Sequence, residues 1–278
     1  MVDSVSIIVA ASMPDAVAQY RILERVGVRA LGEVFRARDT HGRTMLLLVV
    51  DPAIAGDAGR RQAFVDDAKA AAGLSHPNIA ALCDIVEDGD RLCLAFEFVP
   101  GDPLASTIGG RPMNVRRALD LGAQIGDALA EAHAAGLVHG GLTPATVVVT
   151  PKGNAKLLAA GLAAAPAASS AYAAPEQATG GVVDARADIY ALGVVLFEMV
   201  TGRPPLARTR GVNGAVEPPP RPTALNPALP RELDSVIVKA LAANPDHRYE
   251  SVALMAAKLR AVSDILEARR AADERTRM

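Results

Sequence analysis

Tryptophan is absent from the 278 residues, and aromatic residues of all kinds make up only 3% of the sequence. The two cysteines, Cys83 and Cys93, are too few for a disulfide framework, so we expect a reducing, cytoplasmic setting. No charge of either sign is in large excess, because 29 Lys plus Arg face 31 Asp plus Glu. This balance lacks the signature of a general nucleic-acid binder. A sequence with 50% hydrophobic and 22% charged residues nevertheless predicts a folded globular protein.

Long apolar runs are also missing. No stretch reaches the roughly 18 apolar residues that a membrane span needs, so none is expected. The apolar segment 5–11 is short and follows Asp3 rather than a basic stretch, which argues against a signal peptide. The five histidines lie in separate segments without the spacing of metal ligands, so we expect no metal site.

The first third of the sequence has the pattern of strands around one helix. Gly27 and Gly32 separate two alternating segments, and a continuous apolar run at 45–50 indicates a buried strand. Strands are predicted over 20–26, 33–38, 45–50, 79–85 and 92–98, and a helix over 60–74.

The pattern changes to helices after Pro100-Gly101, which marks a boundary between two lobes. The segment 187–201 is apolar nearly all round, so its helix should be buried. A proline-rich connection over 203–230 interrupts the helices, and no internal repeat is found. Helices are predicted over 115–135, 187–201, 232–243 and from 251 onward.

Six short motifs occur in a fixed order along the chain. They are Gly27, Gly32 and Val34; Ser75-His-Pro-Asn78; His139-Gly-Gly-Leu-Thr-Pro144; Ala174-Pro-Glu176; Asp188-Ile-Tyr-Ala-Leu-Gly193; and Asn244-Pro-Asp-His-Arg248. Over about residues 19–262 the sequence thereby resembles the bacterial Ser/Thr protein kinase family. The resemblance implies an α+β, protein-kinase-like bilobal fold with a β-rich N-lobe and an α-helical C-lobe. It implies an N-terminal extension at 1–18, the N-lobe at 19–99, the C-lobe at 100–262 and a charged C-terminal helix or tail at 263–278.

The residues that perform phosphoryl transfer in the family are replaced at their matching positions. The family uses a lysine on the phosphates, a glutamate that holds it, a catalytic aspartate, and an Asn and an Asp that bind magnesium. Those five positions are here, in the same order, Leu48, Asp67, Gly141, Thr146 and Ala159. Further changes are Arg29 for the second glycine of the loop, Leu46 for a small residue under the adenine, Gly140 and Thr143 for the arginine and lysine of the catalytic loop, and Ala160 for the phenylalanine before Gly161.

Positions that the family uses for folding are retained, and the resemblance implies a buried ion pair between Glu176 and Arg248. The retained structural positions are Gly27, Gly32, Val34, His139, Pro144, Gly161, Glu176, Asp188 and Arg248. Loss of the chemistry beside a retained scaffold indicates a fold that is still in use, whereas a recently decaying gene would be the other explanation.

The sequence therefore predicts a pseudokinase that is not an enzyme, without catalytic, cofactor-binding or metal-binding residues. It would act as a scaffold or regulator of a protein partner, such as an active kinase or a phosphoprotein-binding module, with weak or absent ATP binding. The alternative is an atypical Ser/Thr protein kinase or nucleotide-binding enzyme with residual phosphotransfer, using ATP and magnesium. A third interpretation is a sensor that binds an apolar small molecule between Leu46, Leu48 and Phe96. Two interpretations of Arg29 are open: a solvated arginine of the glycine-rich loop, or a cation that reaches inward in place of the missing lysine.

Overall fold

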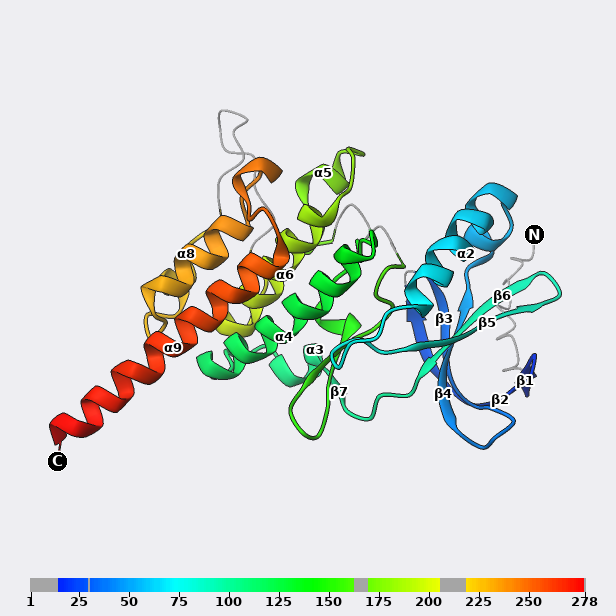
Figure 1. Ribbon diagram of the computed structural model, residues 1–278, viewed down its shortest axis with the longest axis horizontal. Helices are drawn as coiled ribbons and strands as arrows, with labels where there is room; N and C mark the ends of the chain where they lie inside the picture. The colour runs from blue at the N-terminus through cyan, green and yellow to red at the C-terminus, as the bar shows by residue number, and fades with distance from the viewer. Residues whose placement is uncertain (1–14, 30, 163–169, 206–218, 278) are drawn as a thin grey trace, which may run out of the picture.

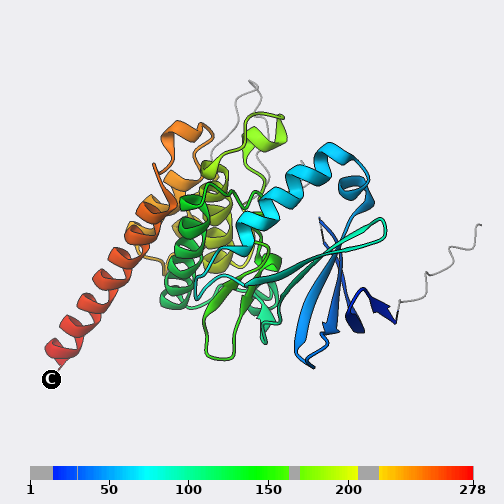
Figure 2. The same ribbon diagram turned by 45° about the vertical axis from the view of Figure 1, so that its right-hand side comes forward.

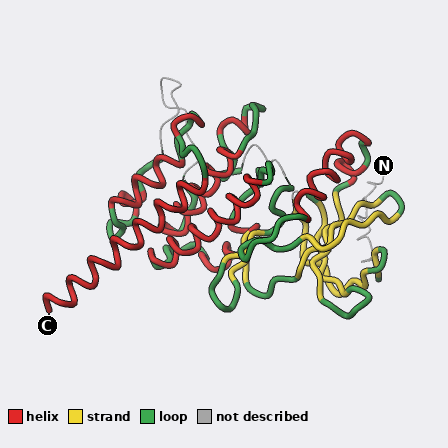
Figure 3. Tube along the Cα trace, viewed as in Figure 1, coloured by secondary structure: helices red, strands yellow, loops and turns green. Residues whose placement is uncertain are grey.

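The computed structural model describes residues 15–29, 31–162, 170–205 and 219–277; for Arg29 it describes only the backbone (Figure 1). Strands gather at one end of the molecule and helices at the other, as Figure 3 shows by colour. The predicted bilobal α+β arrangement is thereby confirmed. The proposed lobe boundary near Pro100-Gly101 lies between the last strand of the larger sheet and the first short elements of the helical part.

The N-lobe is built on one six-stranded sheet in which neighbours pair in the order β1-β2-β3-β4-β6-β5, all antiparallel. The strands are β1 (Ala16–Val17), β2 (Tyr20–Arg29), β3 (Gly32–Arg38), β4 (Thr44–Val50), β5 (Leu82–Asp88) and β6 (Arg91–Glu97). The strand predicted over 79–85 begins three residues later. Its expected first residues instead contact the C-lobe, where the Ala80 N–H donates to the Leu157 carbonyl oxygen at 2.9 Å.

Alternation along β4 divides the apolar residues of the sheet between its two faces. Met45 and Leu47 join a small cluster with Tyr20 and Phe35, whereas Leu48 belongs to the main core of the protein. Helix α1 (Pro52–Ala55) and helix α2 (Ala58–Ala72) follow β4, and α2 crosses beside the sheet (Figure 2). The Asp57 side chain begins α2 by accepting a hydrogen bond from the Arg60 N–H at 2.8 Å.

The C-lobe is formed by α4 (Val115–Ala134), α6 (Ala185–Thr201), α8 (Arg231–Ala240) and α9 (Val252–Arg277). From Ala187 to Val200 every residue of α6 is buried except Glu198, as its nearly uniform apolar sequence predicts. Two glycines of α4 permit close helix packing. A Cβ atom at Gly122 would lie 2.5 Å from Leu196 Cδ2, and one at Gly126 would lie 2.9 Å from the Ala256 Cβ.

Short elements complete the C-lobe: β7 (Asp102–Pro103), α3 (Leu104–Ile108), η1 (Pro144–Thr146), β8 (Val147–Val149), β9 (Ala155–Leu157), α5 (Pro175–Ala178), α7 (Pro222–Leu225) and η2 (Pro245–His247). Strands β7, β8 and β9 form a second, three-stranded sheet. They lie near the N-lobe sheet in Figures 1 and 3, so the loops that line the cleft are held by both lobes.

The two ends of the chain extend the fold in different ways. Of the proposed extension 1–18, β1 pairs with β2, whereas segment 5–11 lies outside the described residues. Helix α9 is continuous, so the proposed tail at 263–278 is helical as far as Arg277, and it projects from the body (Figure 2). In the part of the chain that the structure describes, no helix is both long enough and apolar enough to cross a membrane.

Candidate functional site

A buried carboxylate fixes the loop at the floor of the cleft. Asp188, on α6, is 0% exposed and accepts hydrogen bonds from the backbone N–H groups of His139 at 2.9 Å and Gly140 at 2.8 Å. His133 Nε2, on α4, lies 2.8 Å from Asp188 Oδ2. Gly140 has a φ of +66°, in the region that glycine adopts without a steric penalty. Both oxygens of Asp188 are therefore committed to the scaffold.

The ring of His139 also stabilises the loop. Its Nε2 lies 3.1 Å from the Leu158 carbonyl oxygen, and its Nδ1 accepts from the Gly141 N–H at 3.2 Å. Burial lowers the pKa of His139 below the ordinary value. A neutral ring with both nitrogens engaged is a structural group, because it has no free nitrogen to offer a ligand.

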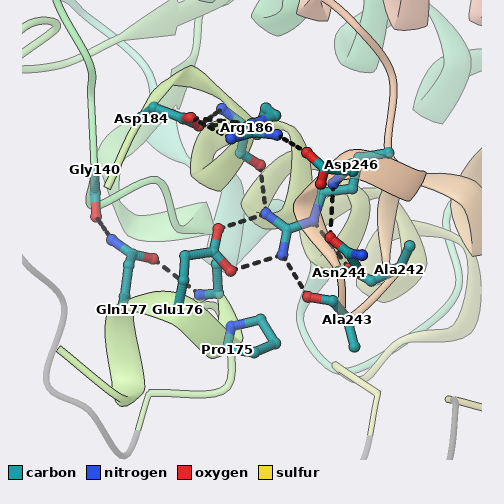
Figure 4. Close-up of polar contacts among 12 residues, drawn as sticks. Gly140, Pro175, Glu176, Gln177, Asp184, Arg186, Ala242, Ala243, Asn244 and Asp246 are labelled. Carbon is teal, nitrogen blue, oxygen red and sulfur yellow. Dashed lines mark hydrogen bonds and ion pairs between the residues drawn. The ribbon is translucent and has the colours of Figure 1, made fainter. Parts of the chain in front are cut away.

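Glu176 and Arg248 form an ion pair in the same lobe, and Figure 4 shows Glu176 with its dashed contacts. Arg248 Nη1 lies 2.6 Å from Glu176 Oε1, and Nη2 lies 2.7 Å from Oε2. The Arg248 side chain is 0% exposed and also donates to the carbonyl oxygens of Arg186, Ala242 and Ala243. The pair thus joins α5, α6 and the segment before α9.

Two further contacts attach the segment around α5 to the lobe. Gln177 Nε2 donates to the Gly140 carbonyl oxygen at 2.7 Å, so α5 touches the same loop that Asp188 holds (Figure 4). The Tyr172 hydroxyl donates to Glu198 Oε2 at 2.6 Å. Burial raises the pKa of Glu198 and that of Tyr172. Two hydroxyl-bearing residues of the segment before α5, Ser170 and Tyr172, are described by the structure. Ser169 lies outside the described residues.

The cleft between the lobes contains a cavity of about 530 Å³. Leu46 and Leu48 both line it, as their spacing of two along a strand predicts. The other lining residues are Glu24, Val26, Leu31, Val34, Arg36, Phe96, Phe98, Val99, Gly101, Pro103, His139, Gly141, Thr143, Ala145, Thr146, Val148, Leu158, Ala159 and Ser170. A volume of this size remains open between these side chains.

Thr143 and Thr146 form hydrogen bonds with each other at the floor of the cavity. The Thr143 N–H donates to Thr146 Oγ1 at 3.0 Å, and that hydroxyl donates to the Thr143 carbonyl oxygen at 2.9 Å. Thr143 Oγ1 in turn accepts from the Ala145 N–H at 3.2 Å. The two threonines thereby cap the short helix η1, and the Thr146 hydroxyl is engaged in that cap.

The residues at the magnesium positions do not fit the ion. Magnesium prefers several oxygen ligands, chiefly carboxylates and water. Ala159 supplies no side-chain oxygen, and the Thr146 hydroxyl is used locally. No group of three or more His, Cys, Asp or Glu side chains that could hold a metal occurs within residues 15–29, 31–162, 170–205 and 219–277.

The remaining positions that the sequence analysis singled out, Asp67, Ala160, Gly161 and Arg29, differ in where they lie relative to this cavity. Asp67, on α2, is exposed and does not line it. Ala160 is buried at 4% exposure, and a Cβ atom on Gly161 would lie 2.7 Å from Leu137 Cδ1. The side chain of Arg29 lies outside the described part of the structure, so its proposed role as a cation has no structural account.

Gly27, Gly32 and Pro144 do not line the cavity themselves, but each is next in sequence to a residue that does. Gly32 has a φ of +144°, and a Cβ atom there would lie 2.0 Å from the Val49 carbonyl oxygen, so no other residue fits. Gly27 has a φ of +153° at a register shift between β2 and β3. Pro144 is buried at the start of η1.

Comparison with known proteins places this architecture in a family. Residues 20–259 match the protein kinase domain. The chain belongs to the protein kinase family. It is 32% identical to the serine/threonine-protein kinase PrkC of Bacillus subtilis over 263 residues, covering 88% of this chain and 41% of PrkC. It is 34% identical to PknB of Mycobacterium tuberculosis over 264 residues, covering 87% of this chain and 42% of PknB. The chain thus spans about two fifths of these curated relatives.

Solved structures support the same assignment. The crystal structure of the Mycobacterium tuberculosis PknI kinase domain superposes with a TM-score of 0.76 at 31% identity. The match covers 90% of this chain and 98% of that domain. The protein-kinase-like fold expected from the sequence is therefore confirmed.

One expectation from the sequence is wrong by these comparisons. We predicted that the chain is not an enzyme, yet its relatives over 87–88% of its length are named serine/threonine-protein kinases. The class to which the chain belongs is thus a class of enzymes. The replaced residues describe how this member differs from the family motif, and they do not remove it from that class.

Proposed function

We propose that this chain is a degenerate member of the protein kinase family, a pseudokinase, that regulates a protein partner through surface contacts and binds ATP weakly. The observation that carries the proposal is the combination of a changed cleft with an intact frame. Leu48 and Ala159 line the cavity where the family motif has its lysine and its metal-binding aspartate. The frame of Asp188, Glu176 and Arg248 is complete beside it.

Weak nucleotide binding follows from the electrostatics of the cavity. A triphosphate is stabilised by cations and by metal ions that bridge its oxygens. The charged side chains that line the cavity are Glu24 and Arg36, and they are 3.0 Å apart on neighbouring strands. Phosphates that entered the cavity would lie beside the apolar side chain of Leu48 instead of a cation.

An active kinase or a phosphoprotein-binding module is the class of partner we propose, in the cytoplasm. The relatives are named protein kinases, and their names imply protein substrates or partners. A domain that keeps the fold and the internal frame of a kinase while its cleft has changed can still bind other proteins through its surface.

Thermal melting with ATP, with and without magnesium or manganese, tests the weak binding. A ligand at about 100 times its Kd adds roughly 2.7 kcal/mol, which is a shift of several degrees. We expect no shift at about 2 mM ATP. The matched variant carries Leu48→Lys, Gly141→Asp and Ala159→Asp together, and we expect a metal-dependent shift for it. A metal-dependent shift of the unmodified chain would contradict the proposal.

The alternative is an atypical Ser/Thr protein kinase that transfers phosphate with groups outside the family motif. The names of the relatives favour it. Asp67 is exposed and Asp188 has both oxygens engaged, so neither is available as a carboxylate in the cleft. Incubation with ATP labelled on its γ-phosphate and a general protein substrate separates the two proposals. Incorporation above that of the Leu48→Ala control would favour the alternative.

A further inference from the structure

We infer that the cavity between the lobes is a binding site for a neutral, predominantly apolar small molecule. This goes beyond the proposed regulatory function, which requires only contacts with a protein. The volume of about 530 Å³ lies within the roughly 300–1,000 Å³ that is typical of sites for drug-sized ligands.

The walls of the cavity are apolar on both sides. Val34, Leu46 and Leu48 approach from the N-lobe sheet, and Phe96 lies on the next strand along from Leu46. Val148 and Leu158 approach from the C-lobe. A ligand between the lobes therefore exchanges water for aliphatic and aromatic surface on opposite faces, which favours apolar ligands in proportion to the area buried.

Each described polar side chain that lines the cavity has at least one partner within the protein, and among the buried atoms of these side chains the Nε of Arg36 makes no hydrogen bond. Glu24 pairs with Arg36, Thr143 with Thr146, and His139 with the Leu158 carbonyl oxygen. The Ser170 Oγ accepts from the Tyr172 N–H at 3.3 Å. A charged ligand would lose its hydration and compete with the partners that these side chains already have, which is unfavourable. A neutral ligand avoids that loss.

The ion pair between Glu24 and Arg36 at the cavity reinforces this selection. The Glu24 and Arg36 side chains are 53% and 40% exposed, so the pair lies where solvent reaches the cavity. Its charges cancel at short range and attract neither an anion nor a cation strongly. The chemistry that fits is thus a compact ring system or a similar apolar body, without a phosphate or carboxylate group.

Titration of the whole chain with the neutral fluorescent probe N-phenyl-1-naphthylamine tests the inference. We expect saturable enhancement of its emission with a Kd on the order of 10 μM, a value suited to a ligand of its size. Ala145 is half-buried and lines the cavity, so Ala145→Phe fills part of the volume. This variant should weaken probe binding at least about tenfold. The matched control Ala261→Phe, at an exposed position of α9, should leave binding unchanged.

A second variant keeps the test decisive if Ala145→Phe does not fold. Leu48→Lys places a cation among the apolar walls and should also weaken the probe. Saturable binding that is equally tight in the folded variants would overturn the inference, because the probe would then lie elsewhere on the surface. Absence of saturable enhancement, or displacement of the probe by about 2 mM ATP with magnesium, would overturn it as well.

Discussion

The guanidinium of Arg248 meets the carboxylate of Glu176 through two parallel hydrogen bonds, at 2.6 Å and 2.7 Å. The Arg248 side chain is fully buried, whereas that of Glu176 is 14% exposed. Removal of one member of such a pair leaves the other charge without a counterion in a medium that solvates it poorly.

Glu176→Ala should lower the free energy of unfolding by roughly 3–5 kcal/mol. The measurement is urea unfolding followed by far-ultraviolet circular dichroism. Glu232→Ala is the matched control, because its pair with Arg269 is exposed and should contribute only about 0–1 kcal/mol. Equal losses for the two variants would contradict the buried role of Glu176.

The stability of the protein should depend on the protonation of His139. Burial lowers the pKa of this ring below its ordinary value of 6.5. Between the two pKa values, the ring is therefore protonated in the unfolded chain and neutral in the folded chain. The contribution of the neutral ring is complete above about pH 6.5 and is lost as the pH falls from there towards the folded pKa. His133 and Asp188 lie beside it and belong to the same network.

The melting temperature should therefore be lower at about pH 5.5 than at about pH 7.5. His139→Gln should reduce this difference, although the variant is less stable at both values. His41→Gln, at an exposed ring, should keep the full difference. An unchanged pH slope in His139→Gln would rule out the ring as its source.

The hydroxyl of Tyr172 should stabilise the segment before α5 through Glu198. Tyr172→Phe leaves the half-buried carboxylate without its donor at 2.6 Å, which should cost about 1–3 kcal/mol. The cost should be smaller in a Glu198→Gln background, because an unpaired amide is less costly to bury than a carboxylate. A double-mutant cycle by chemical unfolding measures this coupling, and a coupling near zero would show that the two side chains act independently.

Ala159 adopts a backbone conformation that suits glycine better than alanine. Its φ is +55°, and a left-handed residue with a Cβ costs roughly 1–2 kcal/mol. Ala159→Gly should therefore raise the free energy of unfolding by about 0.5–1 kcal/mol. Ala261→Gly, in the exposed face of α9, should lower it by about 1 kcal/mol. Loss of stability in Ala159→Gly would contradict the strain.

Local sequence patterns predicted the helices and strands well, and they also predicted part of the candidate site in the cleft. The alternation at β3 and β4 placed Leu46 and Leu48 on the cleft side, because a strand has a period of two. The start of β5 could not be predicted, since residues 78–80 bond to β9 in the other lobe. The pairing of Tyr172 with Glu198 was missed because the two residues lie 26 positions apart in the sequence.

Other contacts in the site had only weak signals in the sequence. His133 lies on α4, six residues before His139 in the sequence. Its partner Asp188 lies 55 residues further along the chain. Gln177 follows the motif residue Glu176 directly, and a polar side chain at the start of a short helix could have suggested a capping contact. Its bond to the Gly140 carbonyl oxygen depends on the loop conformation, which only the folded chain defines.

The segment that follows α2 attaches the sheet to the helices at a second place. The Asn78 side chain donates to the Ala155 carbonyl oxygen at 2.7 Å, and the Leu157 N–H donates to the Asn78 carbonyl oxygen at 2.8 Å. Lys156, between them, bonds to the Ile79 carbonyl oxygen at 3.0 Å and to Glu97, where the chain passes into the C-lobe.

Two rigid bodies that are joined at two points retain a single rotation, about the line through those points. The sheet and the helical part are joined at residues 78–80 and at Glu97, so a change in the width of the cleft corresponds to a rotation about the line through these two places. Lys156 contacts both places, so its side chain links the two connections to each other.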